Sequence, residues 1–164
     1  MKLIKMKNQI KITSKLNPTE QMIEVLGFIL LLAYCSTIYI SYHKLPARIP
    51  IHYNIKGEID HYGSKNTIFI LPFIAILLYI LPLILNKKNK DKDLDTFEND
   101  VNIDKLVRFV KIIIIIIFFS IDYFTIESAL GKSQGLGKWF LMIIYGILLI
   151  PIVYFGYKSY LKFK

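Results

Sequence analysis

The chain has few of the residues and motifs that commonly carry chemistry. Its single cysteine, Cys35, excludes an intramolecular disulfide and says little about redox compartment. The sequence contains no H-E-x-x-H, G-x-S-x-G, P-loop or C-x-x-C pattern, so no enzyme class is indicated. No nucleic-acid-binding motif accompanies the net charge of +9. We therefore expect neither a nucleic-acid partner nor a cofactor.

The chain is also short of polar residues for its length. Hydrophobic residues make up 54% of the 164 residues, and a soluble domain of this size could hardly bury so much apolar surface. A membrane protein need not bury it, because lipid covers its outer surface. Four windows suit a bilayer core of about 30 Å, which takes roughly 20 residues. These windows are 22–42, 67–85, 110–130 and 139–157.

These windows predict an all-α integral membrane protein with four transmembrane helices and the lipid bilayer as its first partner. The first window is too long for a signal-peptide core, and no small-residue cleavage site follows it, so we expect a retained helix. The second helix closes a segment that we take as one domain, 22–85. The third and fourth helices make up 110–157.

The distribution of basic residues predicts the sidedness of these helices. Fifteen of the 21 lysines and arginines lie in the N-terminal tail, in the middle loop with the start of the third span, or in the C-terminal tail. Cytoplasmic segments carry such an excess. We therefore place the basic tail 1–20, the charged loop 86–109 and the basic tail 158–164 in the cytoplasm of a cell-membrane protein. The loop 43–66 then faces outward.

This outward loop contains the stretch "IPIHYNIKGEIDHYGSK", residues 49–65, whose alternation predicts a small β-hairpin between the first two helices. The segment "NIKG" suits a type I turn with Asn54 first and Gly57 fourth. That turn pairs His52 with Asp60 across the strands. One face then carries polar side chains and the other apolar ones, so we expect the apolar face to rest on the membrane or on helix ends.

The histidines of this loop raise the question of a metal ion. Imidazole and carboxylate groups suit zinc and related ions, which makes His52, Asp60 and His61 weak candidates. The simple alternation places His52 and His61 on opposite faces of the hairpin, and their spacing matches no ligand motif. We therefore predict no metal site, and we expect a structural pair between His52 and Asp60.

The loop and its flanks resemble the DUF1648 family, a domain of unknown function. In that family a first span is followed by Leu-Pro, then Ile-Pro-x-His-aromatic-Asn, Gly-x-x-Asp, an aromatic residue and a lysine, and then a second span. The matching positions here are Leu45, Pro46, Ile49, Pro50, His52, Tyr53, Asn54, Gly57, Asp60, Tyr62, Ser64, Lys65 and Pro72.

The resemblance implies a multi-pass bacterial membrane protein, with the hairpin motif as its candidate site. It also implies kinship with the N-terminal part of SdpI-type immunity proteins. Those proteins protect a producer from its own secreted peptide toxin and help to signal that toxin's presence. SdpI-type proteins carry more spans after this domain than the present sequence has, and the family as a whole has no established activity.

Two acidic residues lie in the third span. Asp122 is near its middle, where a carboxylate is costly and usually faces a partner or a cavity. Its partner could be Tyr34, Ser36 or Thr37, or a proton could neutralise it. Asp122 is then either a proton or cation site or a packing residue. Glu127 is closer to the outer surface, and we expect it at the interface.

Three functional hypotheses follow. In the first, the hairpin binds an extracellular peptide or toxin, and the protein serves in immunity or sensing. In the second, Asp122 lies in the pathway of a small transporter, which requires a homo-oligomer because four spans enclose little room. In the third, the protein is an accessory membrane subunit without a ligand.

Overall fold

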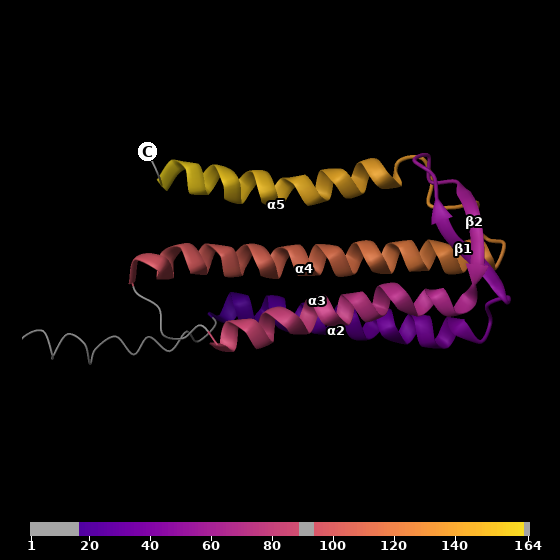
Figure 1. The fold of residues 1–164 in the computed structure, drawn as a ribbon, viewed down its shortest axis with the longest axis horizontal. Helices are drawn as coiled ribbons and strands as arrows, with labels where there is room; N and C mark the ends of the chain where they lie inside the picture. The colour runs from indigo at the N-terminus through magenta and orange to yellow at the C-terminus, as the bar shows by residue number, and fades with distance from the viewer. Residues whose placement is uncertain (1–16, 89–93, 163–164) are drawn as a thin grey trace, which may run out of the picture.

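The structure, a computed structural model, describes residues 17–88 and 94–162 (Figure 1). Most of the predicted tail 1–20, part of the loop 86–109 and the last two residues lie outside the described part of the chain. The elements are α2 (Pro18–Tyr42), β1 (Arg48–Tyr53), β2 (Ile59–Ser64), the 3-10 helix η1 (Lys65–Phe69), α3 (Ile70–Lys88), α4 (Leu94–Ala129) and α5 (Phe140–Lys162).

The four helices alternate in direction along one axis. The β1–β2 hairpin and the loop between α4 and α5 lie at one end of the bundle, here called the hairpin end (Figure 1). The start of α2, the end of α5 and the ends of α3 and α4 that flank 89–93 lie at the opposite end, here called the far end. This arrangement groups the segments as their charges predict. That the far end is cytoplasmic stays a prediction.

Within residues 17–88 and 94–162, three helical segments are long and apolar enough to cross a membrane: Pro18–Tyr42, Lys65–Pro82 and Leu106–Ala129. A shorter apolar stretch, Phe140–Tyr154, lies in α5. Large apolar side chains such as Phe28 and Ile150 are more than half exposed on the outside of these helices. Such surfaces suit a lipid environment, and the helices indicate a multi-pass membrane protein.

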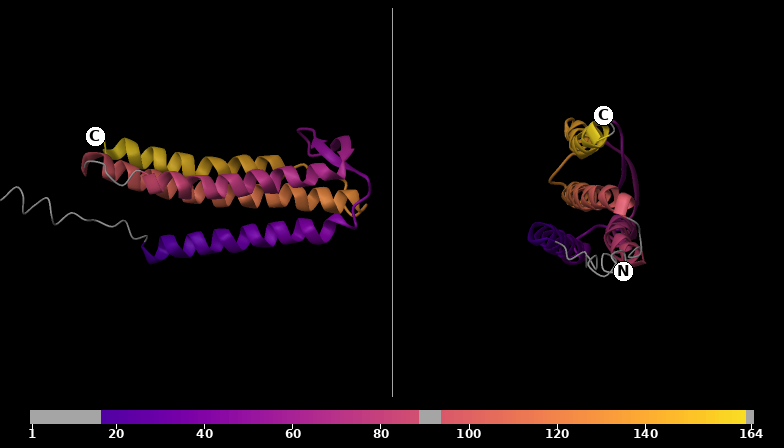
Figure 2. Two further views of the ribbon diagram at one scale, coloured as in Figure 1. Left: turned by 60° about the horizontal axis from the view of Figure 1, so that its bottom comes forward. Right: turned by 90° about the vertical axis from the view of Figure 1, so that its left-hand side faces the viewer.

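The buried core lies between α2, α3 and α4, and α4 is the central helix. Figure 2 shows α4 between α5 and the α2–α3 pair. Leu31, Tyr34 and Ile38 follow one another on α2 at spacings of three and four residues, which places them on one face of the helix. They pack with Ala75 of α3 and Ile115 of α4. The outer faces of the same helices remain apolar and exposed.

The ends of two helices follow local rules of the sequence. Asn17 caps α2: its Oδ1 accepts from the Glu20 N–H at 2.9 Å, and Glu20 Oε2 accepts from the Asn17 N–H at 3.3 Å. Pro18 takes the first helical position, where its missing N–H costs nothing. On α4 the helix begins at Leu94, well before the third span. Much of the charged segment 86–109 is therefore helix.

The hairpin forms with the predicted turn. The Gly57 N–H donates to the Asn54 carbonyl at 2.8 Å, and the Asn54 N–H donates to the Glu58 carbonyl at 2.9 Å. Gly57 has a φ of 76°, the left-handed conformation expected at the fourth position. Tyr53 faces Ile59, as the turn predicts, but the register shifts on both sides of His52, which faces His61. A bulge therefore lies at the centre of the hairpin.

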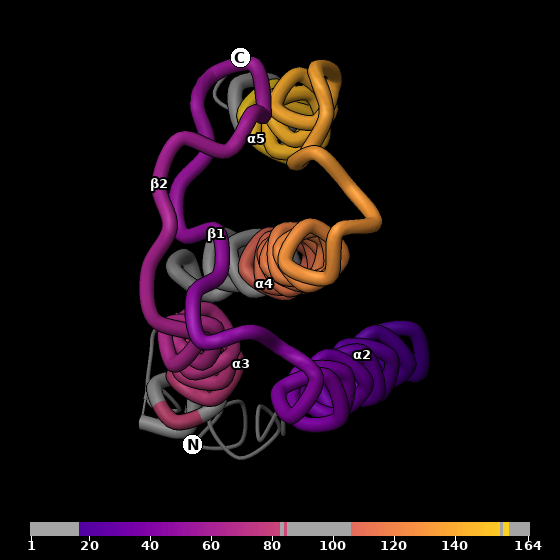
Figure 3. Tube along the Cα trace, turned by 90° about the vertical axis from the view of Figure 1, so that its right-hand side faces the viewer, coloured from indigo at the N-terminus to yellow at the C-terminus, as the bar shows by residue number. Residues whose placement is uncertain are grey.

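The hairpin rests on the end of the helical bundle. β1 packs against α4, and the turn meets the loop between α4 and α5, where the Leu136 N–H donates to the Gly57 carbonyl at 2.8 Å. Figure 3 shows the hairpin crossing the end of the bundle from α3 past α4 toward α5. We expected helix ends to be one possible support for the hairpin, and α4 with the loop that follows it provides this support.

Candidate functional site

A cavity of 330 Å³ lies beneath the hairpin. Its walls come from β1, from the start of the second span and from α4, and most of the lining side chains are aliphatic. Four polar side chains also line it: Tyr53, Thr67, Asp122 and Thr125. Strand β1 of the hairpin and the Asp122 carboxylate, which the sequence offered as separate candidates, therefore line one cavity.

Asp122 is buried, with 4% of its surface exposed, and its partner is Tyr34. The Tyr34 hydroxyl donates to Asp122 Oδ2, which joins α2 to α4. Of the other two expected partners, Ser36 is exposed and Thr37 donates to the Ala33 carbonyl at 2.9 Å. A hydroxyl group therefore satisfies one carboxylate oxygen, and Asp122 also lines the cavity.

Tyr53 fixes the hairpin to α4 beside the same cavity. Its hydroxyl lies 2.8 Å from Thr125 Oγ1, and Thr125 is buried. Burial raises the pKa of Tyr53, and the hydrogen bond with Thr125 acts in the opposite direction. The phenol is therefore neutral at physiological pH.

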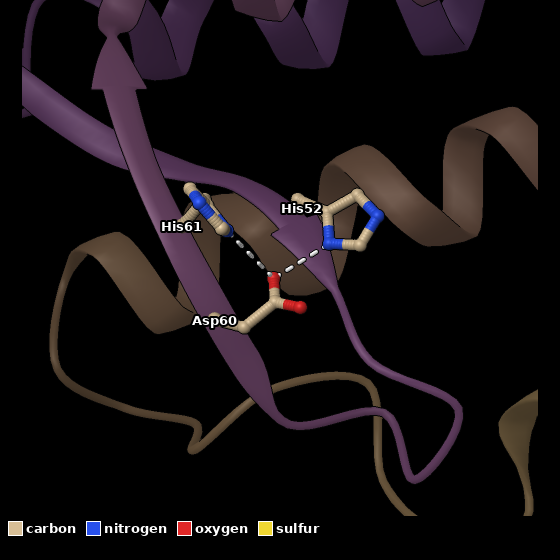
Figure 4. A group of neighbouring side chains, drawn as sticks. All are labelled: His52, Asp60 and His61. Carbon is tan, nitrogen blue, oxygen red and sulfur yellow. Dashed lines mark hydrogen bonds and ion pairs between the residues drawn. The ribbon is translucent and has the colours of Figure 1, made fainter.

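The face of the hairpin that carries His52 does not line the cavity. His52 Nδ1 lies 2.6 Å from Asp60 Oδ1, which is the predicted pair. The prediction that His61 points to the opposite face is wrong, because the bulge pairs His61 with His52 and brings its Nδ1 to 3.6 Å from the same oxygen (Figure 4). The hydrogen bond with His52 is the main cause that holds the pKa of Asp60 below its usual value.

The remaining motif residues have separate positions. Pro50 is buried in the cavity wall, while Tyr62 on the facing strand is exposed. Asn54 holds the turn, since its Oδ1 accepts from the Glu58 N–H at 3.1 Å and its Nδ2 donates to the Glu58 side chain at 2.8 Å. Lys65 lies over the Tyr42 ring, with Nζ 4.5 Å from its centre, where β2 leads into the second span.

Glu127 lies near the end of α4 and is not part of the cavity. Its Oε1 is 3.2 Å from Nζ of Lys132, and both side chains are partly exposed. An exposed pair of this kind contributes little to stability, about 0–1 kcal/mol. That Glu127 lies at the membrane interface stays a prediction.

The sequence did not predict an ionic network around buried Lys111 at the far end. Lys111, which is 4% exposed, donates to Glu24 Oε2 at 2.5 Å, and Arg108 Nε lies 3.3 Å from Glu24 Oε1. Arg108 also pairs with Glu20 at 3.3 Å, and the Tyr79 hydroxyl donates to the Glu24 carbonyl at 2.8 Å. The network therefore joins α2, α3 and α4.

A signal for this network was present in the sequence. Glu20 and Glu24 are four residues apart on one helix face, and Arg108 and Lys111 are three apart on another. Both pairs adjoin the same predicted membrane surface. Arg108 and Lys111 therefore serve both as part of the basic excess and as ion-pair partners of Glu20 and Glu24.

A known protein family matches the part of the chain that contains the hairpin. Residues 29–76 match the family described as a domain of unknown function (DUF1648). No curated protein and no solved structure matches the chain. The matched residues run from α2 through the hairpin into α3, whereas Asp122 and Thr125 of the cavity lie beyond them on α4. The chain is therefore similar to the DUF1648 family over residues 29–76.

Proposed function

We propose that the protein binds an extracellular peptide in the cavity beneath the hairpin and acts in immunity to, or sensing of, a peptide toxin. One observation carries the proposal: a buried carboxylate, Asp122, lies in the wall of an otherwise mainly apolar cavity. Ligand sites commonly combine apolar walls with a few placed polar groups.

The size and chemistry of the cavity limit the kind of ligand that it could bind. Its 330 Å³ is at the lower end of the range of about 300–1,000 Å³ for ligand pockets, so it suits one side chain or one chain end rather than a whole peptide. In the described part of the chain, Tyr34 is the one hydrogen-bond donor found for the Asp122 carboxylate. A cationic or hydrogen-bond-donating group with an apolar body would complement this site.

The predicted sidedness supports an extracellular ligand. If the far end is cytoplasmic, the hairpin and its cavity face the outside of the cell. The resemblance of the hairpin motif to SdpI-type immunity proteins points the same way. The ligand would then enter from the medium and contact both the DUF1648 domain and α4.

Survival in spent medium tests the proposal. A deletion strain is grown in its own species' spent medium with the parent gene or with one of three variants: Asp122→Asn, which removes the charge, Ile51→Trp, which fills the cavity mouth, and Ser36→Ala, an exposed control. We expect the parent and the control to protect and the two cavity variants to fail. Survival of the deletion strain itself rejects the toxin function, and protection by all variants rejects the cavity.

A labelling experiment separates sidedness from binding. In a Cys35→Ala background, Ile51→Cys places a thiol at the cavity wall, where Ile51 is 48% exposed. We expect a membrane-impermeant maleimide to label it in intact cells and the peptide fraction of spent medium to slow this labelling. Labelling only after lysis would overturn the outward orientation. Labelling at an unchanged rate would show that the peptides do not occupy the cavity.

The far-end network favours proton or cation transport as a second candidate. It lies on the same three-helix interface as Asp122, at a distance of about 16 Å along α4, the length of the helical rise from Lys111. However, Leu31, Ala75 and Ile115 are buried in the apolar core of this interface. A pathway would have to form elsewhere, for example between the copies of a homo-oligomer.

Proteoliposomes with a pH-sensitive dye inside distinguish this candidate. Proton uptake by the parent that is lost in Asp122→Asn would favour transport. Vesicles of the parent that acidify no faster than empty vesicles would reject it. Normal growth of the deletion strain together with the absence of uptake would leave an accessory subunit without a ligand as the function.

A further inference from the structure

The exposed face of the hairpin carries three potential metal ligands that the fold brings together. His52 lies on β1, and Asp60 and His61 are consecutive residues on β2. Consecutive residues of a regular strand point to opposite faces. Here the register shifts around His52 instead place all three side chains on one side of the hairpin (Figure 4).

The distances between these ligand atoms are close to those of a metal site. His52 Nδ1 and His61 Nδ1 lie 2.6 Å and 3.6 Å from Asp60 Oδ1. One potential ligand atom from each residue lies within 4.8 Å of those of the other two. Ligands bound tetrahedrally at about 2.0–2.1 Å are about 3.3 Å apart. Small rotations of exposed side chains would therefore make the three distances equal around one ion.

We propose that His52, Asp60 and His61 bind one Zn²⁺ ion on the exposed face of the hairpin. Two imidazoles and a carboxylate form a ligand set that zinc accepts in proteins with a fourth position left open. Water or a donor group from a partner would take that position. The proposal is independent of the peptide-binding cavity, because none of these three residues lines it.

A metal ion bound at the bulge would stabilise the hairpin. A two-stranded hairpin is marginally stable by itself. An ion held by β1 and β2 together would cross-link the strands, and its binding free energy would contribute to their folding. None of the three residues lines the cavity, so the ion would stabilise the hairpin above the cavity without occupying it.

Zinc binding by the purified full-length protein tests the proposal. The protein is purified in detergent with a tag that contains no histidine, and Zn²⁺ is titrated in competition with a chromogenic chelator. We expect one ion per chain. We expect His52→Ala, Asp60→Asn and His61→Ala each to weaken binding by at least about tenfold, since even outer-shell partners of metal ligands contribute about 10- to 100-fold.

The third histidine provides a matched control. His43 caps the end of α2, outside the group of three, and packs against Tyr39 and Tyr42. His43→Ala should bind zinc like the parent. Amide hydrogen exchange in 48–64 should slow on addition of zinc in the parent and in His43→Ala, but not in the three ligand variants. Equal affinities for all variants, or no stoichiometric binding by the parent, would overturn the proposal.

Discussion

Replacement of Gly57 by alanine tests how the hairpin is held on the bundle. Gly57 has a φ of 76°, and an added Cβ would lie 2.5 Å from the Gly137 carbonyl oxygen. The left-handed conformation costs an alanine about 1–2 kcal/mol. Overpacking against backbone atoms costs about 1–3 kcal/mol more. We therefore expect a loss of about 2–5 kcal/mol in the free energy of unfolding.

Gly131 separates the two contributions. Its φ of 75° nearly equals that of Gly57, but a Cβ added there meets nothing within 4 Å. Gly131→Ala should thus show only the conformational cost of about 1–2 kcal/mol. The difference between the two variants measures the contact between the hairpin and the loop after α4.

Equilibrium unfolding in mixed detergent micelles provides the assay. The lone Cys35 is half-buried in α2 and reports exposure through its reaction with a thiol-specific dye. A second clashing position, Gly135, would place its Cβ 2.3 Å from the Gly57 carbonyl oxygen. Because both changes break one contact, the double variant should lose less than the sum of the single losses. Equal losses for Gly57→Ala and Gly131→Ala would refute the reasoning.

Three further predictions concern buried polar groups. Glu24→Gln should lower the free energy of unfolding by about 3–5 kcal/mol, because it leaves buried Lys111 without its closest carboxylate. Equilibrium unfolding in mixed detergent micelles measures this loss. Tyr34→Phe should cost about 1–3 kcal/mol in the same assay, since Asp122 loses its donor. Burial raises the pKa of Tyr53, so this side chain makes a pH-dependent contribution to the free energy of unfolding. The contribution is complete below the unfolded pKa of about 10 and is lost as pH rises through the folded pKa. Tyr53→Phe should therefore lose less stability than the parent when unfolding is measured across this alkaline range.

Each of these predictions has an outcome that would contradict it, and the first also has a control variant. Lys132→Gln removes the partly exposed pair with Glu127 and should cost less than about 1 kcal/mol. A similar cost for Glu24→Gln would contradict a buried network. An unchanged stability of Tyr34→Phe would show that Asp122 does not depend on this hydroxyl. Parallel alkaline profiles of the parent and Tyr53→Phe would show that Tyr53 does not titrate differently on folding.

Local and periodic features could be predicted from the sequence. Asn17, Pro18 and Glu20 define the start of α2 because a capping box uses only groups within one turn. The apolar windows predict spanning helices because hydrophobic length is set by the bilayer. The turn at 54–57 could be predicted because its fourth residue is a glycine, and glycine adopts the positive φ of this position without strain.

The bulge and the contacts between helices could not be predicted in the same way. Alternation along a strand assumes a regular register, and the register shifts on both sides of His52 bring His61 opposite His52. Asp122 and Tyr34 are 88 residues apart, so their pairing depends on how α2 packs on α4. The same holds for Glu24 and Lys111, which are 87 apart.

The sequence by itself determined that this is a helical chain with apolar segments of membrane-spanning length, a hairpin of defined turn and a motif similar to that of the DUF1648 family. These features depend on composition, periodicity and residues a few positions apart. Only the tertiary structure decided that the hairpin covers a cavity with Asp122 in its wall and that His52, Asp60 and His61 share one face. Such groupings arise from the packing of segments far apart in the chain and from the register between strands, which no local pattern of residues specifies.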